Sequence, residues 1–101
     1  MTGPLDEITQ DAALPTFEVF ARFCVEAPSA AEAQVTVVRM LAAADDRPSD
    51  VVLERQERPG AWMVVARFVV VSIEAHTAVV GVSETLAELR PDEVWAGDQL
   101  A

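Results

Sequence analysis

The sequence of 101 residues contains no lysine, no asparagine and no tyrosine, and it has a single histidine and a single cysteine. All seven basic residues are arginines, and 17 aspartates and glutamates oppose them, which gives a formal net charge of −10. Proteins that bind DNA, RNA or anionic membranes neutralise phosphates with clustered basic side chains. Because the chain has no such cluster, we expect no nucleic-acid partner and no membrane partner.

The scarcity of cysteine and of long apolar runs indicates in which cellular compartment the protein is expected. Cys24 alone cannot form an internal disulfide, so the chain does not follow the pattern of a small secreted disulfide scaffold. Residues 1–14 carry three acidic residues, no basic residue and no long apolar run, unlike a signal peptide. The longest apolar block, residues 62–71, contains Arg67 and is too short to cross a membrane as a helix. We therefore expect a cytoplasmic protein.

Side chains that commonly do catalysis or bind metals are also few. His76 has no visible partner for general acid–base catalysis, so we interpret it as a surface histidine. One histidine and one distant cysteine do not make a metal site, and the acidic clusters at residues 45–50 and 92–93 lack the spacing of a calcium loop. The four glycines are too scattered for a phosphate-binding loop. The sequence predicts no catalytic residue, no cofactor and no metal.

What the sequence does contain is 51% hydrophobic residues in clear patterns. Alternation over residues 17–25 predicts a strand with one fully apolar face. Residues 51–57 predict a more polar strand at a sheet edge, and residues 62–71 predict a central strand that is apolar on both faces. Proline and glycine within residues 58–61 predict a hairpin between these two strands. Residues 93–96 predict a short final strand.

Two helices are expected between the strands. The S-A-A-E spacing at residues 29–32 is that of a capping box and predicts a helix to about residue 44. Ser72 is a candidate N-cap for a second helix that extends to Arg90, with Gly81 as a weak point unless close packing requires it. We expect the buried stripes to be Ala31, Val35, Val38, Leu41 and Ala42 in the first helix, and Ala75, Ala78, Val79, Val82, Leu86 and Leu89 in the second.

These elements predict a single α+β domain over residues 17–96, with residues 1–16 as a flexible N-terminal arm and residues 97–101 as a C-terminal tail. Right-handed crossovers favour a four-stranded antiparallel sheet in the order 4-1-3-2, with both helices on one face. This βαββαβ layout resembles the ferredoxin-like sandwich. The resemblance is architectural, and because the fold is widely shared it implies no function.

The sheet face away from the helices is expected to be mostly apolar, whereas a solvent-facing sheet would be polar. An exposed apolar patch of this kind marks an interaction site. We expect a homodimer through this face; the alternatives are that the chain's own ends fold across it or that another protein covers it. The candidate ligand or interface residues on this face are Phe20, Arg22, Cys24, Met63, Val65, Arg67 and Val69.

Arg22 and Arg67 are the two cations predicted on this face, on neighbouring strands. They could hold a carboxylate or phosphate ligand together. Alternatively, ion pairs with Glu18, Glu54 or the acids of a second subunit account for both arginines. Cys24 could act as a nucleophile if the neighbouring arginines lowered its pKa, but we interpret it as a small buried hydrophobic residue.

Three functions from different classes fit these patterns. The first is a small acidic, non-catalytic protein-interaction or adaptor module that acts as a homodimer and whose charge suits a basic protein partner. The second is a small-molecule-binding regulatory dimer with an anionic ligand near Arg22 and Arg67. The third is a dimeric α+β barrel enzyme, whose cavity would offer only Arg22, Cys24, Arg67 and Glu54. We expect the first, because no catalytic set is visible.

Overall fold

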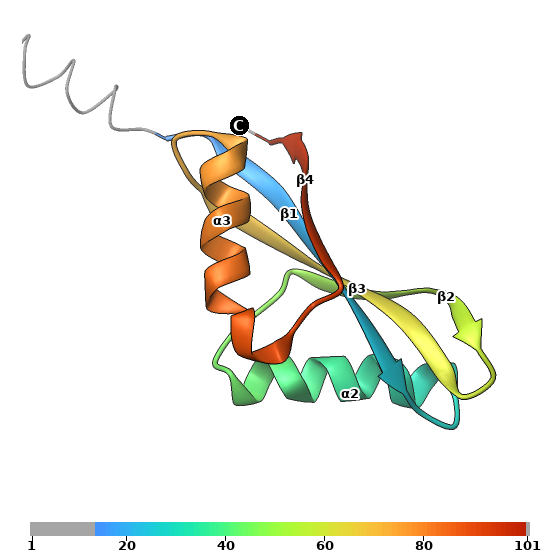
Figure 1. Cartoon of the computed structure of the whole chain (residues 1–101). Coiled ribbons are helices and arrows are strands. Elements are labelled where there is room, and N and C mark those ends of the chain that lie inside the picture. The colour runs from blue at the N-terminus through green and yellow to red at the C-terminus, as the bar shows by residue number, and fades with distance from the viewer. Residues whose placement is uncertain (1–13, 101) are drawn as a thin grey trace, which may run out of the picture.

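A computed structural model describes residues 14–100 of the chain (Figure 1). Its elements are β1 (Thr16–Glu26), α2 (Ala30–Ala43), β2 (Asp50–Arg58), β3 (Ala61–Val71), α3 (Ala75–Thr85), the short 3-10 helix η1 (Ala87–Leu89) and β4 (Glu93–Gln99). This is the βαββαβ order that the sequence predicts. The expected N-terminal arm, residues 1–16, lies mostly outside the described residues, and Thr16 already belongs to β1.

The four strands form one antiparallel sheet in the order β2-β3-β1-β4, which is the predicted order read from the other edge. Figure 1 shows β1 and β3 as a long, twisted central pair, with α2 and α3 covering different parts of its length. α2 lies against β1, β2 and β3, whereas α3 lies against β1 and β4. No helix in the described part of the chain is long and apolar enough to cross a membrane.

One hydrophobic core lies between the sheet and both helices, so both helices cover the same face. As the alternation predicts, β1 turns every second side chain into it: Phe17, Val19, Ala21, Phe23 and Val25. β3 adds Val64, Ala66 and Phe68, and the stripe predicted for the second helix is confirmed by the burial of Ala78, Val82 and Leu86. The exclusion of this apolar surface from water is the main force that holds the domain together.

The buried stripe of α2 shares only Leu41 with the predicted one. Ala33, Val37 and Leu41 are buried, whereas Val35 and Val38 are 44% and 48% exposed. α2 carries small apolar residues on almost every side, so its sequence contains two stripes of helical period on opposite faces. The prediction chose the wrong one, and four of its members face solvent: Ala31, Val35, Val38 and Ala42.

The two α-helices begin differently. At the start of α2, the Ser29 hydroxyl accepts a hydrogen bond from the Glu32 amide at 3.2 Å, as the capping box predicts. α3 begins after Glu74, which makes no side-chain cap, so the assignment of Ser72 as the N-cap is wrong. Ser72 is instead buried, and its amide donates to the carbonyl of Pro15 at 3.1 Å. This bond ties the end of β3 to the segment before β1. The helix begins only after Glu74.

The C-terminus of α2 closes with a Schellman motif. The amide of Asp45 donates to the carbonyl of Ala42 at 3.0 Å, and the amide of Asp46 donates to the carbonyl of Leu41 at 2.8 Å. Asp45 has a φ of 60°, in the left-handed region that usually selects glycine. The turn therefore holds an aspartate in a backbone conformation that is unfavourable for it.

The edges of the sheet are irregular. The register of β2 on β3 shifts between Leu53 and Arg55 and again between Gln56 and Arg58, as at β-bulges. The predicted hairpin is confirmed: it turns at Gly60, whose φ of 80° requires glycine. At the other edge β4 extends to Gln99, so most of the predicted C-terminal tail is strand.

Candidate functional site on the open face of the sheet

The open face is the side of the sheet turned away from α2 and α3, and strand register fixes which residues share it. Phe20 lies opposite Arg67 on β3 and Trp95 on β4, while Val65 lies opposite Val52 on β2. The register places all seven sequence candidates on this face: Phe20, Arg22, Cys24, Met63, Val65, Arg67 and Val69.

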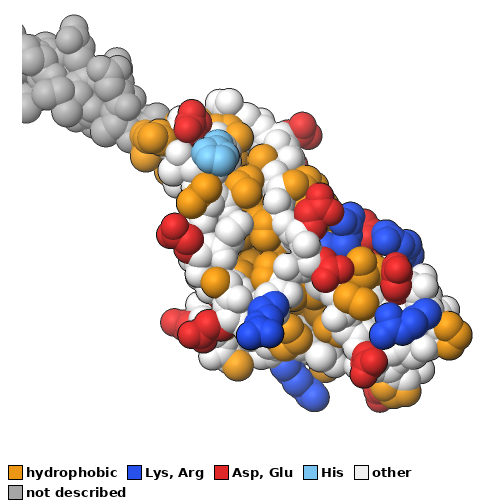
Figure 2. All heavy atoms as spheres, viewed as in Figure 1, with side chains coloured by type: hydrophobic (Ala, Val, Ile, Leu, Met, Phe, Trp, Pro, Cys, Tyr) orange, Lys and Arg blue, Asp and Glu red, His pale blue; other side chains and the backbone are white. Residues whose placement is uncertain are grey.

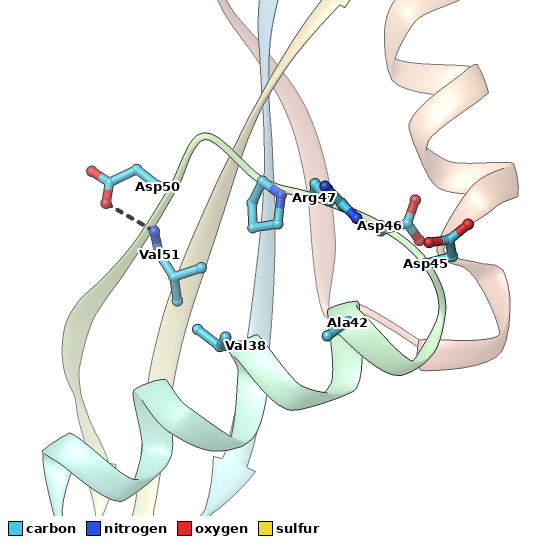
Figure 3. A pocket seen from close by; sticks show the side chains of 8 residues that line it. Val38, Ala42, Asp45, Asp46, Arg47, Asp50 and Val51 are labelled. Atoms are coloured by element: carbon cyan, nitrogen blue, oxygen red, sulfur yellow. Dashed lines mark hydrogen bonds between the residues drawn. The ribbon is translucent and has the colours of Figure 1, made fainter.

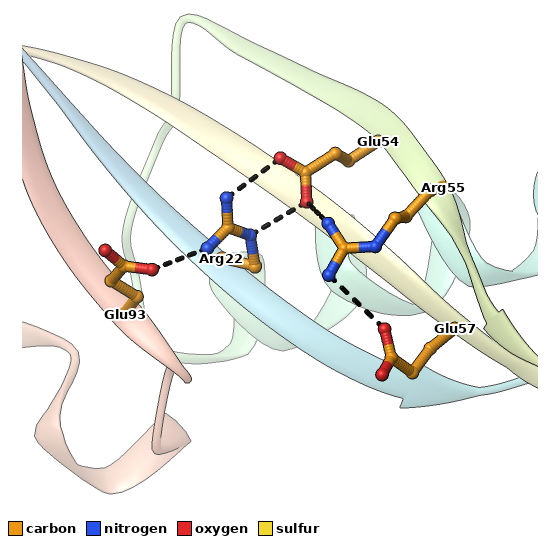
Figure 4. A network of polar contacts seen from close by, with 5 residues as sticks. All are labelled: Arg22, Glu54, Arg55, Glu57 and Glu93. Atoms are coloured by element: carbon orange, nitrogen blue, oxygen red, sulfur yellow. Dashed lines mark hydrogen bonds and ion pairs between the residues drawn. The ribbon is translucent and has the colours of Figure 1, made fainter.

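Arg22 is the centre of a network of five charged side chains (Figure 4). Its Nε and Nη2 donate to the two carboxylate oxygens of Glu54 at 2.8 and 2.9 Å, and its Nη1 donates to Glu93 at 2.6 Å. Glu54 also accepts from Arg55 at 2.8 Å, and Arg55 donates to Glu57 at 3.3 Å. The two-pronged Arg22–Glu54 pairing is the strongest geometry available to these groups.

The Arg22–Glu54 pair shifts the proton affinities of both partners. The hydrogen bond from Arg22 lowers the pKa of Glu54 below its ordinary value of 4.5, against an opposing contribution from burial. The same bond raises the pKa of Arg22. Both groups therefore stay charged at neutral pH, and the pair spans β3, which lies between their two strands.

Arg67 forms a second, separate ion pair on the open face. Its Nε donates to Oε2 of Glu18 on β1, and its Nη1 donates to the Ser49 hydroxyl at 2.8 Å. Oε1 of Glu18 accepts from the amide of Asp98 on β4 at 3.2 Å. The hydrogen bond from Arg67, followed by the one from Asp98, lowers the pKa of Glu18 below its ordinary value of 4.5.

The two arginines thus follow the ion-pair alternative drawn from the sequence, with Glu54 and Glu18 as partners. They do not share a carboxylate, and each is held by acidic side chains of its own chain. An anionic ligand near Arg22 and Arg67 would have to displace these carboxylates.

An aromatic pair lies beside the charged network. The rings of Phe20 and Trp95 are stacked, with centroids 5.5 Å apart and planes inclined by 23°. The guanidinium carbon of Arg22 lies 4.7 Å from the Trp95 ring centroid, within the range of a cation–π interaction. Trp95 was not among the sequence candidates. The predicted order 4-1-3-2, which places the last strand beside the first, was the signal that could have found it.

The apolar side chains of the open face are only partly covered. Val52 and Val69 are 50% and 47% exposed, and Phe20, Val65 and Trp95 are half-buried. A shallow hollow of about 290 Å³ lies on this face, lined by Phe20, Asp50, Val52, Glu54, Val65 and Arg67. Aromatic and aliphatic surface surrounded by charged groups is a composition found at protein interfaces.

Two candidates differ from expectation. Cys24 is exposed, so its interpretation as a small buried hydrophobic residue is wrong. The pairing of β1 with β4 ends at Arg22 and Glu93, so no strand lies beside Cys24 on that side. Met63, which lies opposite Cys24 on β3, is only 7% exposed.

His76, the residue considered for acid–base catalysis, does not lie on the open face. His76 is exposed on α3, as expected for a surface histidine. Within residues 14–100, no group of three histidine, cysteine, aspartate or glutamate side chains is placed to hold a metal ion.

A second hollowed region surrounds the loop between α2 and β2, which the sequence did not single out. Figure 3 shows Val38 and Ala42 of α2 and Val51 of β2 at a hollow of about 500 Å³. Both α2 residues belong to its exposed apolar stripe. The rest of the lining comes from the loop and the start of β2: Asp45, Asp46, Arg47, Pro48 and Asp50.

Comparison of the chain with protein-family models, with curated proteins and with solved structures finds no match. The chain is therefore classified from its own structure alone. The chain is an α+β domain whose antiparallel sheet is covered by helices on one face. The other face carries stacked aromatic rings, exposed valines and arginines paired within the chain.

Proposed function

We propose that this chain is a non-catalytic protein-interaction module of the cytoplasm that forms a homodimer through the open face of its sheet. The observation that carries this function is the combination of half-exposed apolar side chains with arginines already paired within the chain. Burial of the apolar groups favours association. Because Arg22 and Arg67 bring their own partners, neither would enter an interface as an unpaired charge.

Charge balance on the open face favours a second copy as the partner. The ion pairs there join three arginines to four glutamates, which nearly cancel, whereas the whole chain carries −10. Repulsion between two copies that meet through this face is therefore smaller than their overall charges imply. In Figure 2, basic and acidic side chains are mixed over the strands.

The two alternatives stay predictions without an observation in their favour. An anionic ligand near Arg22 and Arg67 competes with carboxylates that already occupy both guanidinium groups. A dimeric barrel enzyme would need a base or an orienting group beside Cys24. The carboxylates nearest the centre of the face are engaged with arginines instead.

Sedimentation velocity of the full chain over a wide range of concentrations tests the dimer. We expect the native chain to dimerise and Val52→Asp and Val69→Asp to be monomeric, because each places a charge in the interface. Val35→Asp is the matched control, since Val35 is exposed to a similar extent (44%) but lies on α2. A native chain that is monomeric throughout, or a dimer that survives both open-face substitutions, would contradict the proposal.

The exposed thiol of Cys24 offers an independent measurement of the same interface. Its reaction with a disulfide reagent should slow as the protein concentration rises, because the dimer covers the open face. In Val69→Asp the rate should not depend on concentration. A rate that is independent of concentration in the native chain as well would contradict a dimer that covers this end of the face.

A further inference from the structure

Four exposed apolar side chains gather at one end of the molecule, where β1 begins and β3 and β4 end (Figure 1). They form the terminal cluster, which consists of Leu14, Val71, Ile73 and Leu100, with exposures of 43%, 62%, 68% and 45%. Val71 lies opposite Thr16, the first residue of β1. The amide of Leu100 donates to the carbonyl of Thr16 at 2.7 Å. Val71 and Leu100 therefore flank the same residue of β1 from its two neighbouring strands.

The other two members of the cluster lie just beyond the paired strands. Leu14 and Ile73 are the chain neighbours of Pro15 and Ser72, which the 3.1 Å backbone bond holds together. Ile73 and Val71 are the two most exposed large hydrophobic residues within residues 14–100. Single exposed residues of this kind are ordinary, but four of them at one end form a surface that calls for a covering group.

The first turn of α3 lies beside the cluster, because Ile73 is two residues before Ala75. The first backbone bond of this helix runs from the amide of Ala78 to the carbonyl of Glu74 at 3.1 Å. The amides of the three residues before Ala78 have no such partner, and the side chain of Glu74 does not cap them. These amides and the positive end of the helix dipole favour a carboxylate from another segment.

The chain itself contains a segment that suits both features. Residues 1–13 carry three acidic side chains, no basic one, and the apolar side chains of Leu5 and Ile8. This segment joins the domain at Leu14, which is a member of the cluster. A chain spans at most about 3.5 Å per residue, so Asp11 stays within about 10 Å of Leu14 and Ile8 within about 20 Å. Attachment at this point also keeps the effective concentration of the segment at the cluster in the millimolar range.

We propose that residues 1–13 dock on their own domain and cover the terminal cluster. Ile8 packs against Ile73 and Val71, and the Asp11 carboxylate accepts hydrogen bonds from the first amides of α3. Val71 lies on the same side of β3 as Val69, so the docked segment borders the open face and shields apolar surface next to it. The inference does not depend on the proposed dimer, because the segment and the cluster belong to one chain.

Ile8 and Ile73 are the two isoleucines of the chain, which makes their contact directly measurable. Full-length protein labelled with ¹³C only at its isoleucine δ1 methyl groups should show a nuclear Overhauser effect between the two methyls. The measurement is repeated in Val52→Asp, the variant expected to be monomeric. The effect in both samples supports the proposal, and its absence from either sample would overturn it.

A mixture of ¹³C-labelled and unlabelled chains shows whether the contact lies within one chain. We expect no isotope-filtered effect between an isoleucine methyl of a labelled chain and one of an unlabelled chain. Such an effect would place the segment on a second copy and would overturn docking within the chain.

Asp11→Ala tests the contact with the helix. Loss of the acceptor should speed hydrogen exchange of the first-turn amides of α3 about fivefold, which is the effect of losing an N-cap of ordinary strength. Asp11→Asn should keep the native rates within about twofold, because asparagine caps as well as aspartate. Asp6→Ala is the matched control, since it removes the same charge at a position farther from Leu14 along the chain. Equal rates in Asp11→Ala and Asp6→Ala would overturn the proposal.

Failure of this proposal can be distinguished from failure of the dimer. A chain that sediments as a monomer and still shows the contact between Ile8 and Ile73 supports the docked segment and contradicts the dimer. A dimer without that contact overturns the docked segment and leaves the open face as an interface.

Discussion

Gly97 of β4 lies so close to Phe20 of β1 that a Cβ at position 97 would come within 2.5 Å of Cε2 of the Phe20 ring. The same Cβ would lie 3.0 Å from Oε1 of Glu18, the oxygen that accepts from the Asp98 amide. Phe20 is held in turn by stacking on Trp95. Glycine at position 97 is therefore a requirement of close approach between β4 and the open face.

Gly97→Ala should lower the free energy of unfolding by about 1–3 kcal/mol, since either the Phe20 ring or Glu18 must move. Urea denaturation followed by tryptophan fluorescence measures this loss, and the stacked Trp95 reports on the site itself. Gly81→Ala is the control, because its Cβ meets open space. That variant should instead gain about 1 kcal/mol from better helix propensity. Equal losses in the two variants would contradict the close approach at Gly97.

Asp45→Gly should raise the free energy of unfolding by about 1 kcal/mol, because glycine adopts a φ of 60° without the penalty that a Cβ brings. Urea denaturation midpoints provide the measurement. Ala44→Gly is the neighbouring control: Ala44 has a φ of −88°, so glycine there brings only extra freedom to the unfolded chain and should destabilise. A loss of stability in Asp45→Gly would show that its side chain contributes more than its backbone costs.

Acid should destabilise the domain partly through Glu18 and Glu54. Both have a pKa lowered below 4.5 in the folded chain by hydrogen bonds from arginines. Their stabilising contribution is therefore complete above the ordinary pKa of the unfolded chain, and it is lost as the pH falls through the lowered folded pKa. Urea midpoints recorded from neutral to acid pH should fall less steeply in Glu18→Gln and Glu54→Gln. Glu88→Gln, at an exposed position on η1, should follow the native curve.

The order and pairing of the strands could be predicted because β1 and β3 carry long, unambiguous alternation. Each has a continuous apolar face, and the hairpin turn at Gly60 fixes the relation of β3 to β2. The partners of Arg22 and Arg67 also followed from the sequence, since Glu54 and Glu18 lie on the same open face and opposite charges pair.

The features that could not be predicted depend on packing between elements. α2 has two apolar stripes, and only its docking on the sheet selects Val37 over Val38 for burial. The stack of Phe20 on Trp95, and the need for glycine at position 97, arise from the approach of β4 to β1.

The bulges of β2 limit how copies of this chain can assemble. A regular edge strand offers a row of free backbone groups to which further strands can add without end. The two register shifts in β2 interrupt that row, and glutamates and arginines follow one another along the strand. β4 has a similar irregularity where it meets Phe17 and Val19. Growth from either edge into fibres is thereby discouraged, so the proposed face-to-face dimer would remain a closed pair even in concentrated solution.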